Sequence, residues 1–159
     1  MAGTKELRDG FLKAFGPWFL ERMAGQHSFE RLSRILERSK ETVYDRVLHA
    51  ADSPIHLEAS RHIIGIEGWG QRRLRVALGE PLRMGGHRAY RPSESLSCVD
   101  LALEFARTRM NTLGLIPLLE GAEYAHKIPH DGMGPLSVKA WLYYLHLHAW
   151  IESFGLRRV

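Results

Sequence analysis

The sequence contains one cysteine, Cys98, among its 159 residues. A single cysteine cannot form an internal disulfide, and a cluster of thiolate metal ligands requires several. The sequence also has no secretory signal pattern and no long apolar run without charges, so we expect a soluble, cytoplasmic protein without a membrane segment. Internal repeats and low-complexity tracts are absent too, which excludes repeat architectures.

The composition is that of an ordinary globular protein, with 45% hydrophobic and 25% charged residues. Its length fits a single domain with one core. The formal net charge of +4 is too small to indicate nucleic-acid binding by itself. Neither a Ser-His-Asp nor a Cys-His arrangement occurs in a recognisable local context, and Cys98 fits a small core residue better than a nucleophile.

Four long segments have apolar residues at the three- and four-residue spacing of an amphipathic helix. We expect these helices over Ser28–Ala50, over Ile55–Leu78, from Ser93 or Ser95 to a kink or end at Pro117, and over Ser137–Phe154. Ser28, Ser53 and Ser137 suit N-caps, and Gly79 suits a left-handed C-terminal cap. The inward stripe expected on the third helix consists of Leu96, Val99, Leu103, Ala106, Met110 and Leu113.

Four such helices predict an all-α protein, an antiparallel four-helix bundle over residues 28–159. Residues 1–27 form an aromatic N-terminal helical extension, which Gly16 and Pro17 should break. The extension is expected to pack on the bundle or to cover a partner subunit, and we expect a homodimer.

The last helix carries the first candidate ligands. Its inward stripe passes through Trp141 and Leu145 and then reaches His148 and Glu152, which are four residues apart and can therefore face one point. An inward carboxylate is costly unless a cation, either a metal or an arginine, pairs with it. The alternative is that the core ends near Leu145 and that His148 and Glu152 are exposed to solvent at its edge.

Other histidines allow weaker inferences. His62 lies on the inward stripe of the second helix, where a lone histidine is usually a hydrogen-bonded core residue. His126 and His130 have ligand-like spacing, but Pro129 argues against a helix there, and a structural role for His130 is favoured over a metal role. His146 differs from His148 in helical phase by about 200 degrees and is discounted. Glu67 differs from His62 in helical phase by about 140 degrees. We therefore expect it at the surface, or in contact with a ligand residue rather than with the metal itself.

Two stretches resemble the DinB/YfiT-like family. They are RHIIGIEGWGQRRLRVALGEP, from Arg61 to Pro81, and HKIPHDGMGPLSVKAWLYYLHLHAW, from His126 to Trp150. The resemblance extends from Ser28 onward and implies a four-helix bundle with a divalent metal held by three histidines. By position these fall on His62, His148 and Glu152, so a carboxylate replaces the third histidine. Asp131 also departs from the family pattern, which usually has proline there.

The resemblance implies a metal such as Zn, Ni, Mn or Fe and metal-assisted thiol transfer to electrophiles, isomerisation or hydrolysis. Two histidines and a carboxylate are a legitimate ligand set for these metals. The alternative is a vestigial site in a non-enzymatic stress-response or dimerisation module. A nucleic-acid interface ranks last, because no groove-reading motif accompanies the arginines of the second helix, which are Arg61, Arg72, Arg73 and Arg75.

Overall fold

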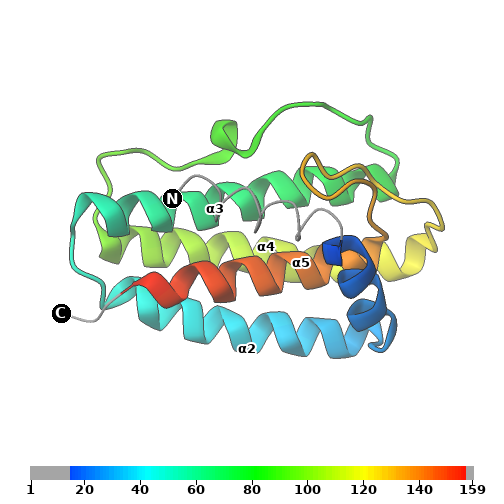
Figure 1. The fold of residues 1–159 in the computed structure, drawn as a ribbon, viewed down its shortest axis with the longest axis horizontal. Coiled ribbons are helices and arrows are strands. Elements are labelled where there is room, and N and C mark those ends of the chain that lie inside the picture. The colour runs from blue at the N-terminus through cyan, green and yellow to red at the C-terminus, as the bar shows by residue number, and fades with distance from the viewer. Residues whose placement is uncertain (1–14, 157–159) are drawn as a thin grey trace.

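A computed structural model of the protein describes residues 15–156, and every regular element in that range is helical (Figure 1). A helix over residues 15–25 precedes the long helices α2 (Phe29–Leu48), α3 (Pro54–Leu74), α4 (Cys98–Ala122) and α5 (Val138–Glu152). Short 3-10 turns occur at η1 (Arg75–Leu78), η2 (His87–Tyr90) and η3 (Ser153–Gly155). The all-helical prediction is confirmed, and none of these helices is both long and apolar enough to cross a membrane.

The predicted caps of three helices are present. The side chains of Ser28, Ser53 and Ser137 each accept a hydrogen bond from a backbone N–H in the first turn of α2, α3 and α5. Gly79 ends η1 with a φ of 94°, a left-handed conformation that favours glycine. Local sequence therefore determines where these helices begin and where the α3–η1 segment ends.

Helix α4 differs from the prediction in its start, its end and its buried face. Ser97 caps it in a capping box with Asp100, in place of Ser93 or Ser95, and the helix continues through Pro117. Leu103 and Met110, expected inside, are more than half exposed. The predicted phase was wrong because α4 has apolar residues on several sides, and its buried face includes polar residues. That face consists of Cys98, Leu101, Ala102, Phe105, Arg109, Thr112, Leu115, Ile116 and Leu119.

The helix directions also correct the expected antiparallel order. The start of α4 lies beside the start of α3, since the Cys98 N–H donates to Asp52 Oδ1 at 2.7 Å. The end of α3 lies beside the segment after α4, where Arg73 donates to the Pro129 carbonyl at 2.7 Å. Helices α3 and α4 therefore run in the same direction, because the connection over residues 79–97 returns along α3 (Figure 1).

Helices α2 and α5 form the second parallel pair, with the opposite direction. Lys139, at the start of α5, donates to the His27 carbonyl, and Arg46, near the end of α2, donates to the Trp150 carbonyl. The four long helices pack along one another and bury Trp141 completely, as predicted.

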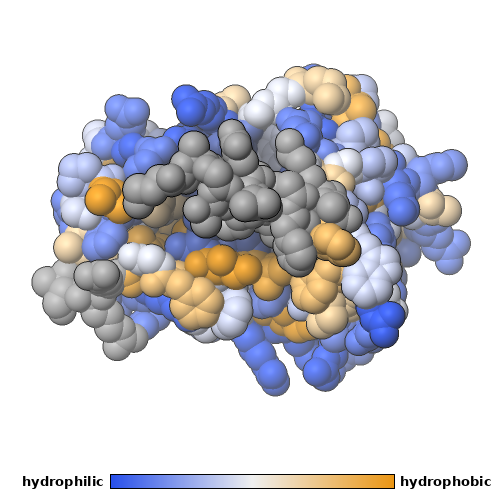
Figure 2. All heavy atoms as spheres, viewed as in Figure 1, coloured by the Kyte–Doolittle hydropathy of each residue, from blue (hydrophilic) through white to orange (hydrophobic). Residues whose placement is uncertain are grey.

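The helix over residues 15–25 packs against the start of α5. Its Glu21 carboxylate accepts hydrogen bonds from the Ser137 N–H and hydroxyl at 2.8 and 2.7 Å, and Leu20 is buried. This helix begins at residue 15 and includes Gly16 and Pro17, and residues 1–14 of the predicted extension, which precede the expected break, lie outside the described range. Apolar residues gather on the face that carries α5 (Figure 2). The exposed ones from this helix, the end of α5 and η3 are Phe15, Trp18, Phe19, Trp150, Ile151 and Phe154.

Candidate metal centre

A close approach of α3 to α5 brings the two candidate histidines together. Gly70 permits it, because a Cβ at this position would lie 2.5 Å from Leu145 Cδ2. His62 lies about two turns before Gly70 on α3, and His148 lies about one turn after Leu145 on the oppositely directed α5. Their Nε2 atoms are 3.2 Å apart.

At this separation the two nitrogens form a hydrogen bond, and the distance is also close to that of two imidazoles that share a metal. Two nitrogens at 2.0–2.1 Å from a tetrahedral Zn²⁺ lie about 3.3–3.4 Å apart. One turn beyond His148, Glu152 supplies a carboxylate, and one ligand atom from each of the three residues lies within 4.8 Å of the others. Because Glu152 is exposed at the end of α5, its side chain has room to move the remaining distance. The residues present thus fit a divalent metal with three protein ligands.

Both rings are held in the neutral form that binds metals. Burial lowers the pKa of His148 to about 3, and positive charge on His62, His87 and His130 acts in the same direction. Burial also lowers the pKa of His62, with Arg91 adding to the effect and Glu58 opposing it. The charge of Glu152 contributes to the raised pKa of Tyr144, after burial, so this phenol stays protonated near the site.

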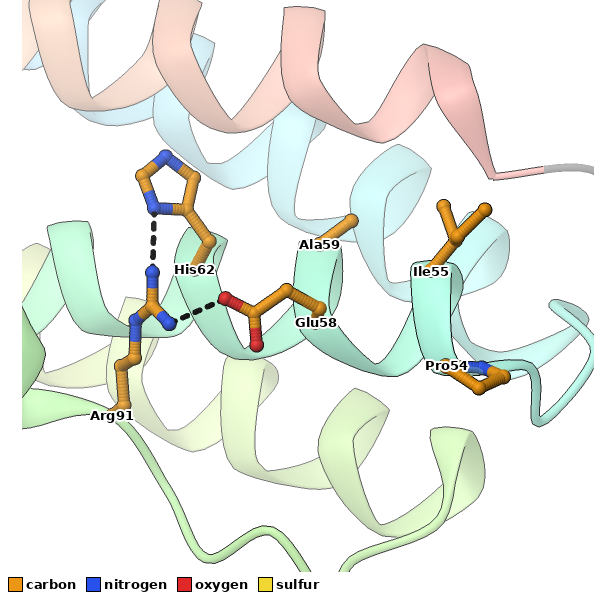
Figure 3. A pocket seen from close by; sticks show the side chains of 6 residues that line it. All are labelled: Pro54, Ile55, Glu58, Ala59, His62 and Arg91. Atoms are coloured by element: carbon orange, nitrogen blue, oxygen red, sulfur yellow. Dashed lines mark hydrogen bonds and ion pairs between the residues drawn. The ribbon is translucent and has the colours of Figure 1, made fainter.

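Arg91 contacts the opposite nitrogen of His62 (Figure 3). Its guanidinium donates to His62 Nδ1 at 3.4 Å and to the Glu58 carboxylate at 2.5 Å. A ring that accepts at Nδ1 carries its proton on Nε2, the atom that faces His148. Metal binding through Nε2 requires the other tautomer, with the proton on Nδ1, and Glu58 is the nearby carboxylate that could accept it. Arg91 and a metal therefore favour opposite tautomers of His62.

A third histidine, which sequence reasoning missed, lies beside this pair. The ring of His87 packs edge-on against His62 with centroids 4.9 Å apart, and its buried Nδ1 has no hydrogen-bond partner in the described chain. Gly65 of α3 lets the segment that contains His87 and Arg91 pack closely against this helix. A Cβ at Gly65 would lie 2.8 Å from Arg91 Cγ and 3.1 Å from the His87 carbonyl. In the sequence, Gly65 indicates that another segment can pack closely against α3, but it does not indicate which segment does so.

The other histidines behave largely as expected. His130 is a structural group, since its Nδ1 accepts from the Gly132 and Met133 N–H groups at 3.0 and 3.1 Å. Exposed His126 packs against Tyr124. Within residues 15–156, His62, His148 and Glu152 form the single group of three such donors close enough for one ion, and neither His126, His130 nor His146 belongs to it.

Glu67 lies neither at the surface nor against a proposed ligand, the two positions expected for it. It is 1% exposed and accepts from Arg109 Nε at 2.7 Å, from Arg109 NH2 at 3.0 Å and from the Thr112 hydroxyl at 2.7 Å. Arg109 also donates to the Leu36 carbonyl and the Ser39 hydroxyl. Glu67 is four residues after Ile63, and Arg109 is four after Phe105, so helical spacing from buried neighbours could have revealed both.

Three arginines of α3 are engaged in ion pairs. Arg61 pairs with Glu58, Arg72 with Glu80, and Arg73 with Asp131. Arg73 is buried, and its guanidinium also lies over the Trp69 ring. Burial, followed by hydrogen bonding to Asp52, raises the pKa of Cys98 to about 11, which agrees with a core residue rather than a nucleophile.

Comparison with protein-family models, curated proteins and solved structures found no match to this chain.

Proposed function

We propose that the protein is a DinB-like metal-binding protein in which His62, His148 and Glu152 hold one divalent metal. The observation that carries this proposal is the pair of neutral imidazoles, with Nε2 atoms 3.2 Å apart and a carboxylate one turn away. Neutral imidazole and carboxylate ligands suit Zn, Ni, Mn or Fe. Three protein ligands leave a coordination position open for a water or a small ligand.

The proposed reaction class is metal-assisted transfer of a small-molecule thiol to an electrophile, isomerisation or hydrolysis. A bound metal would supply Lewis-acid activation at the open position. The chain itself contributes a ring orientation fixed by α3 and α5, and a half-buried, neutral His148. Tyr144 adds a protonated phenol near Glu152, which can donate a hydrogen bond to a bound oxygen.

We also propose that the four long helices form a four-helix bundle of the DinB-like type. Two parallel pairs in opposite directions, with the long connection over residues 79–97 linking α3 to α4 within one pair, are a known bundle arrangement. A cytoplasmic homodimer is proposed on the exposed aromatic residues of the helix over 15–25 and of the end of α5. Light scattering at micromolar concentration tests the dimer, and a monomer would contradict it.

One observation favours a second candidate, a non-enzymatic module with a vestigial site. Glu152 is exposed, and the three donors lie within 4.8 Å of one another, a looser grouping than the contact of about 3.3–3.4 Å between two ligands of one tetrahedral metal. In that case the protein would act through its surfaces alone, in a stress response or in dimerisation.

Elemental analysis and calorimetric titration with Zn²⁺, Ni²⁺ and Mn²⁺ separate the two candidates. We expect one metal per chain in the wild type, loss of binding in His62→Ala and His148→Ala, and weaker binding in Glu152→Ala. Glu152→His should retain or strengthen Zn²⁺ and Ni²⁺ binding. His126→Ala is the matched control, because this exposed histidine lies outside the donor group, and it should bind like the wild type. No uptake by the wild type would favour the non-enzymatic module.

A further inference from the structure

A small cavity borders the candidate metal centre. It has a volume of about 180 Å³, and its walls come from α5, from the helix over residues 15–25 and from the loop before α5. Apart from Tyr144, His148 and Glu152, every residue that lines it is apolar or glycine. These residues are Gly16, Phe19, Leu20, Met133, Leu147 and Ile151.

The volume limits what this cavity can hold. An apolar cavity of about 150 Å³ remains free of water and can bind benzene. The cavity beside His148 is slightly larger and offers water few hydrogen-bond partners along its apolar walls. It therefore fits an apolar group about the size of one aromatic ring.

Two of the three proposed ligands, His148 and Glu152, form the polar end of the same cavity. A divalent metal held by two neutral histidines and one ionised carboxylate has a net charge of +1. Such a centre attracts a ligand with a single negative charge, and the cavity then determines the shape of the rest of that ligand.

We propose that the metal centre binds a small organic monoanion with a compact apolar body. The anionic head, a carboxylate or hydroxamate, occupies the open metal position, and an aryl or short branched alkyl group fills the cavity between α5 and the helix over residues 15–25. This inference rests on the proposed function, because without the metal the cavity has no cation to recognise the head group.

Two hydroxamates that share a head group and differ in body test the inference. Acetohydroxamate carries only a methyl group, whereas benzohydroxamate carries a ring that the cavity can bury. Burial of an aromatic ring should make benzohydroxamate bind about 10- to 100-fold more tightly to the zinc-loaded protein. Calorimetry on the zinc-loaded full chain measures both affinities, and the metal-free protein should bind neither.

Leu147→Trp tests the role of the cavity, because the larger side chain would occupy it. This variant should lose the preference for benzohydroxamate and keep its affinity for acetohydroxamate and for zinc. Leu103→Trp is the matched control, since Leu103 is 57% exposed on α4 and does not line the cavity. It should behave like the wild type.

The outcomes distinguish this inference from the function on which it rests. If the wild type takes up zinc and binds the two hydroxamates equally, the inference is overturned and the metal site stands. A preference that survives Leu147→Trp would also overturn it, by placing the ring elsewhere. If the wild type takes up no zinc, both proposals fail. Should Leu147→Trp not fold, the affinity ratio in the wild type still decides.

Discussion

Two polar clusters both contact α3 and α5, the first joining α2 and α4 as well, and they differ in how well their hydrogen bonds are satisfied. In the first, Glu67 and Arg109 are almost fully buried, and both carboxylate oxygens and all three guanidinium nitrogens are hydrogen-bonded. In the second, His62 and His148 contact each other, and His148 Nδ1 is buried without a hydrogen-bond partner in the described chain. Glu152 is in no ion pair found among residues 15–156.

The difference indicates a separation of roles. A buried ion pair with every donor and acceptor satisfied needs nothing from outside the chain, and it holds α2, α3, α4 and α5 in register. In the second cluster, a buried histidine nitrogen has no hydrogen-bond partner within the described range and the nearby carboxylate has no cation there, so these residues alone do not satisfy the two groups. We therefore assign the first cluster to structure and the second to binding, and each prediction below tests that assignment.

The largest effect should follow from breaking the interior ion pair. Arg109→Met would leave the Glu67 carboxylate buried without its cation, which should lower the free energy of unfolding by about 3–5 kcal/mol. Urea denaturation at neutral pH measures the change. The double variant Glu67→Leu/Arg109→Met is the control and should recover much of the loss. A single variant as stable as the wild type would show that the pair does not hold the helices together.

The apolar core supplies a reference for a purely structural residue. Trp141 is completely buried and contacts Trp69 and His130 through its ring, so Trp141→Ala should lower the free energy of unfolding by about 3–5 kcal/mol. Urea denaturation measures this change as well. Added zinc should still stabilise the variant if it folds, because Trp141 is not a proposed ligand. A loss of only a few tenths of a kcal/mol would contradict its burial.

The binding cluster should respond to metal in the opposite way. Zinc at 100 times its dissociation constant should stabilise the wild type by about 2.7 kcal/mol, because the folded state alone presents the assembled site. Thermal unfolding with and without zinc measures this. His148→Ala should lose the zinc-dependent increase in Tm, whereas His126→Ala should keep it. An equal increase in wild type and His148→Ala would place the metal elsewhere.

Arg91 offers a smaller and more specific change. Because its guanidinium favours the His62 tautomer that cannot bind metal through Nε2, Arg91→Gln should tighten zinc binding by about tenfold, as expected for the loss of a single hydrogen bond to a charged group. Glu58→Gln should weaken binding, since an amide replaces the carboxylate that could accept a hydrogen bond from the Nδ1–H of the metal-binding tautomer. Calorimetric titration measures both, and weaker binding by Arg91→Gln would contradict the assigned tautomer.

The smallest effect concerns His130 and pH. Burial lowers its pKa to about 4, so between pH 6.5 and about 4 the unfolded chain takes up a proton that the folded chain does not. The free energy of unfolding should therefore fall as the pH decreases through this window. His130→Gln should reduce that fall by about 1 kcal/mol, measured by urea denaturation at pH 7 and pH 5.5. An unchanged pH dependence would show that His130 does not contribute.

The sequence was sufficient to predict the helices with clear caps and one-sided apolar stripes. Ser53 with Pro54 marked the start of α3, and Gly79 marked the end of the turn that follows it. It was not sufficient for α4, where apolar residues on several sides allowed a second helical phase and so concealed Arg109. The antiparallel order was wrong because the length of a connection alone does not show that it returns along a helix.

The candidate site was predictable in part. His148 and Glu152 lie on one helix face, so their spacing was informative, and the family resemblance added His62. His87 and Arg91 could not be placed from the sequence. Both belong to the connection between α3 and α4, which packs closely against α3 because Gly65 has no side chain. Contacts of that kind depend on tertiary packing, which helical periodicity does not specify.

The central claim is that the incomplete cluster binds a metal and that the satisfied one does not. An anomalous difference map, from a crystal grown with zinc and measured at the zinc absorption edge, tests it most directly. We predict one peak between α3 and α5, about 2.0–2.2 Å from His62 Nε2, His148 Nε2 and a Glu152 oxygen. A map without a peak at these three residues, or with its main peak at His126 or another surface histidine, would contradict the claim.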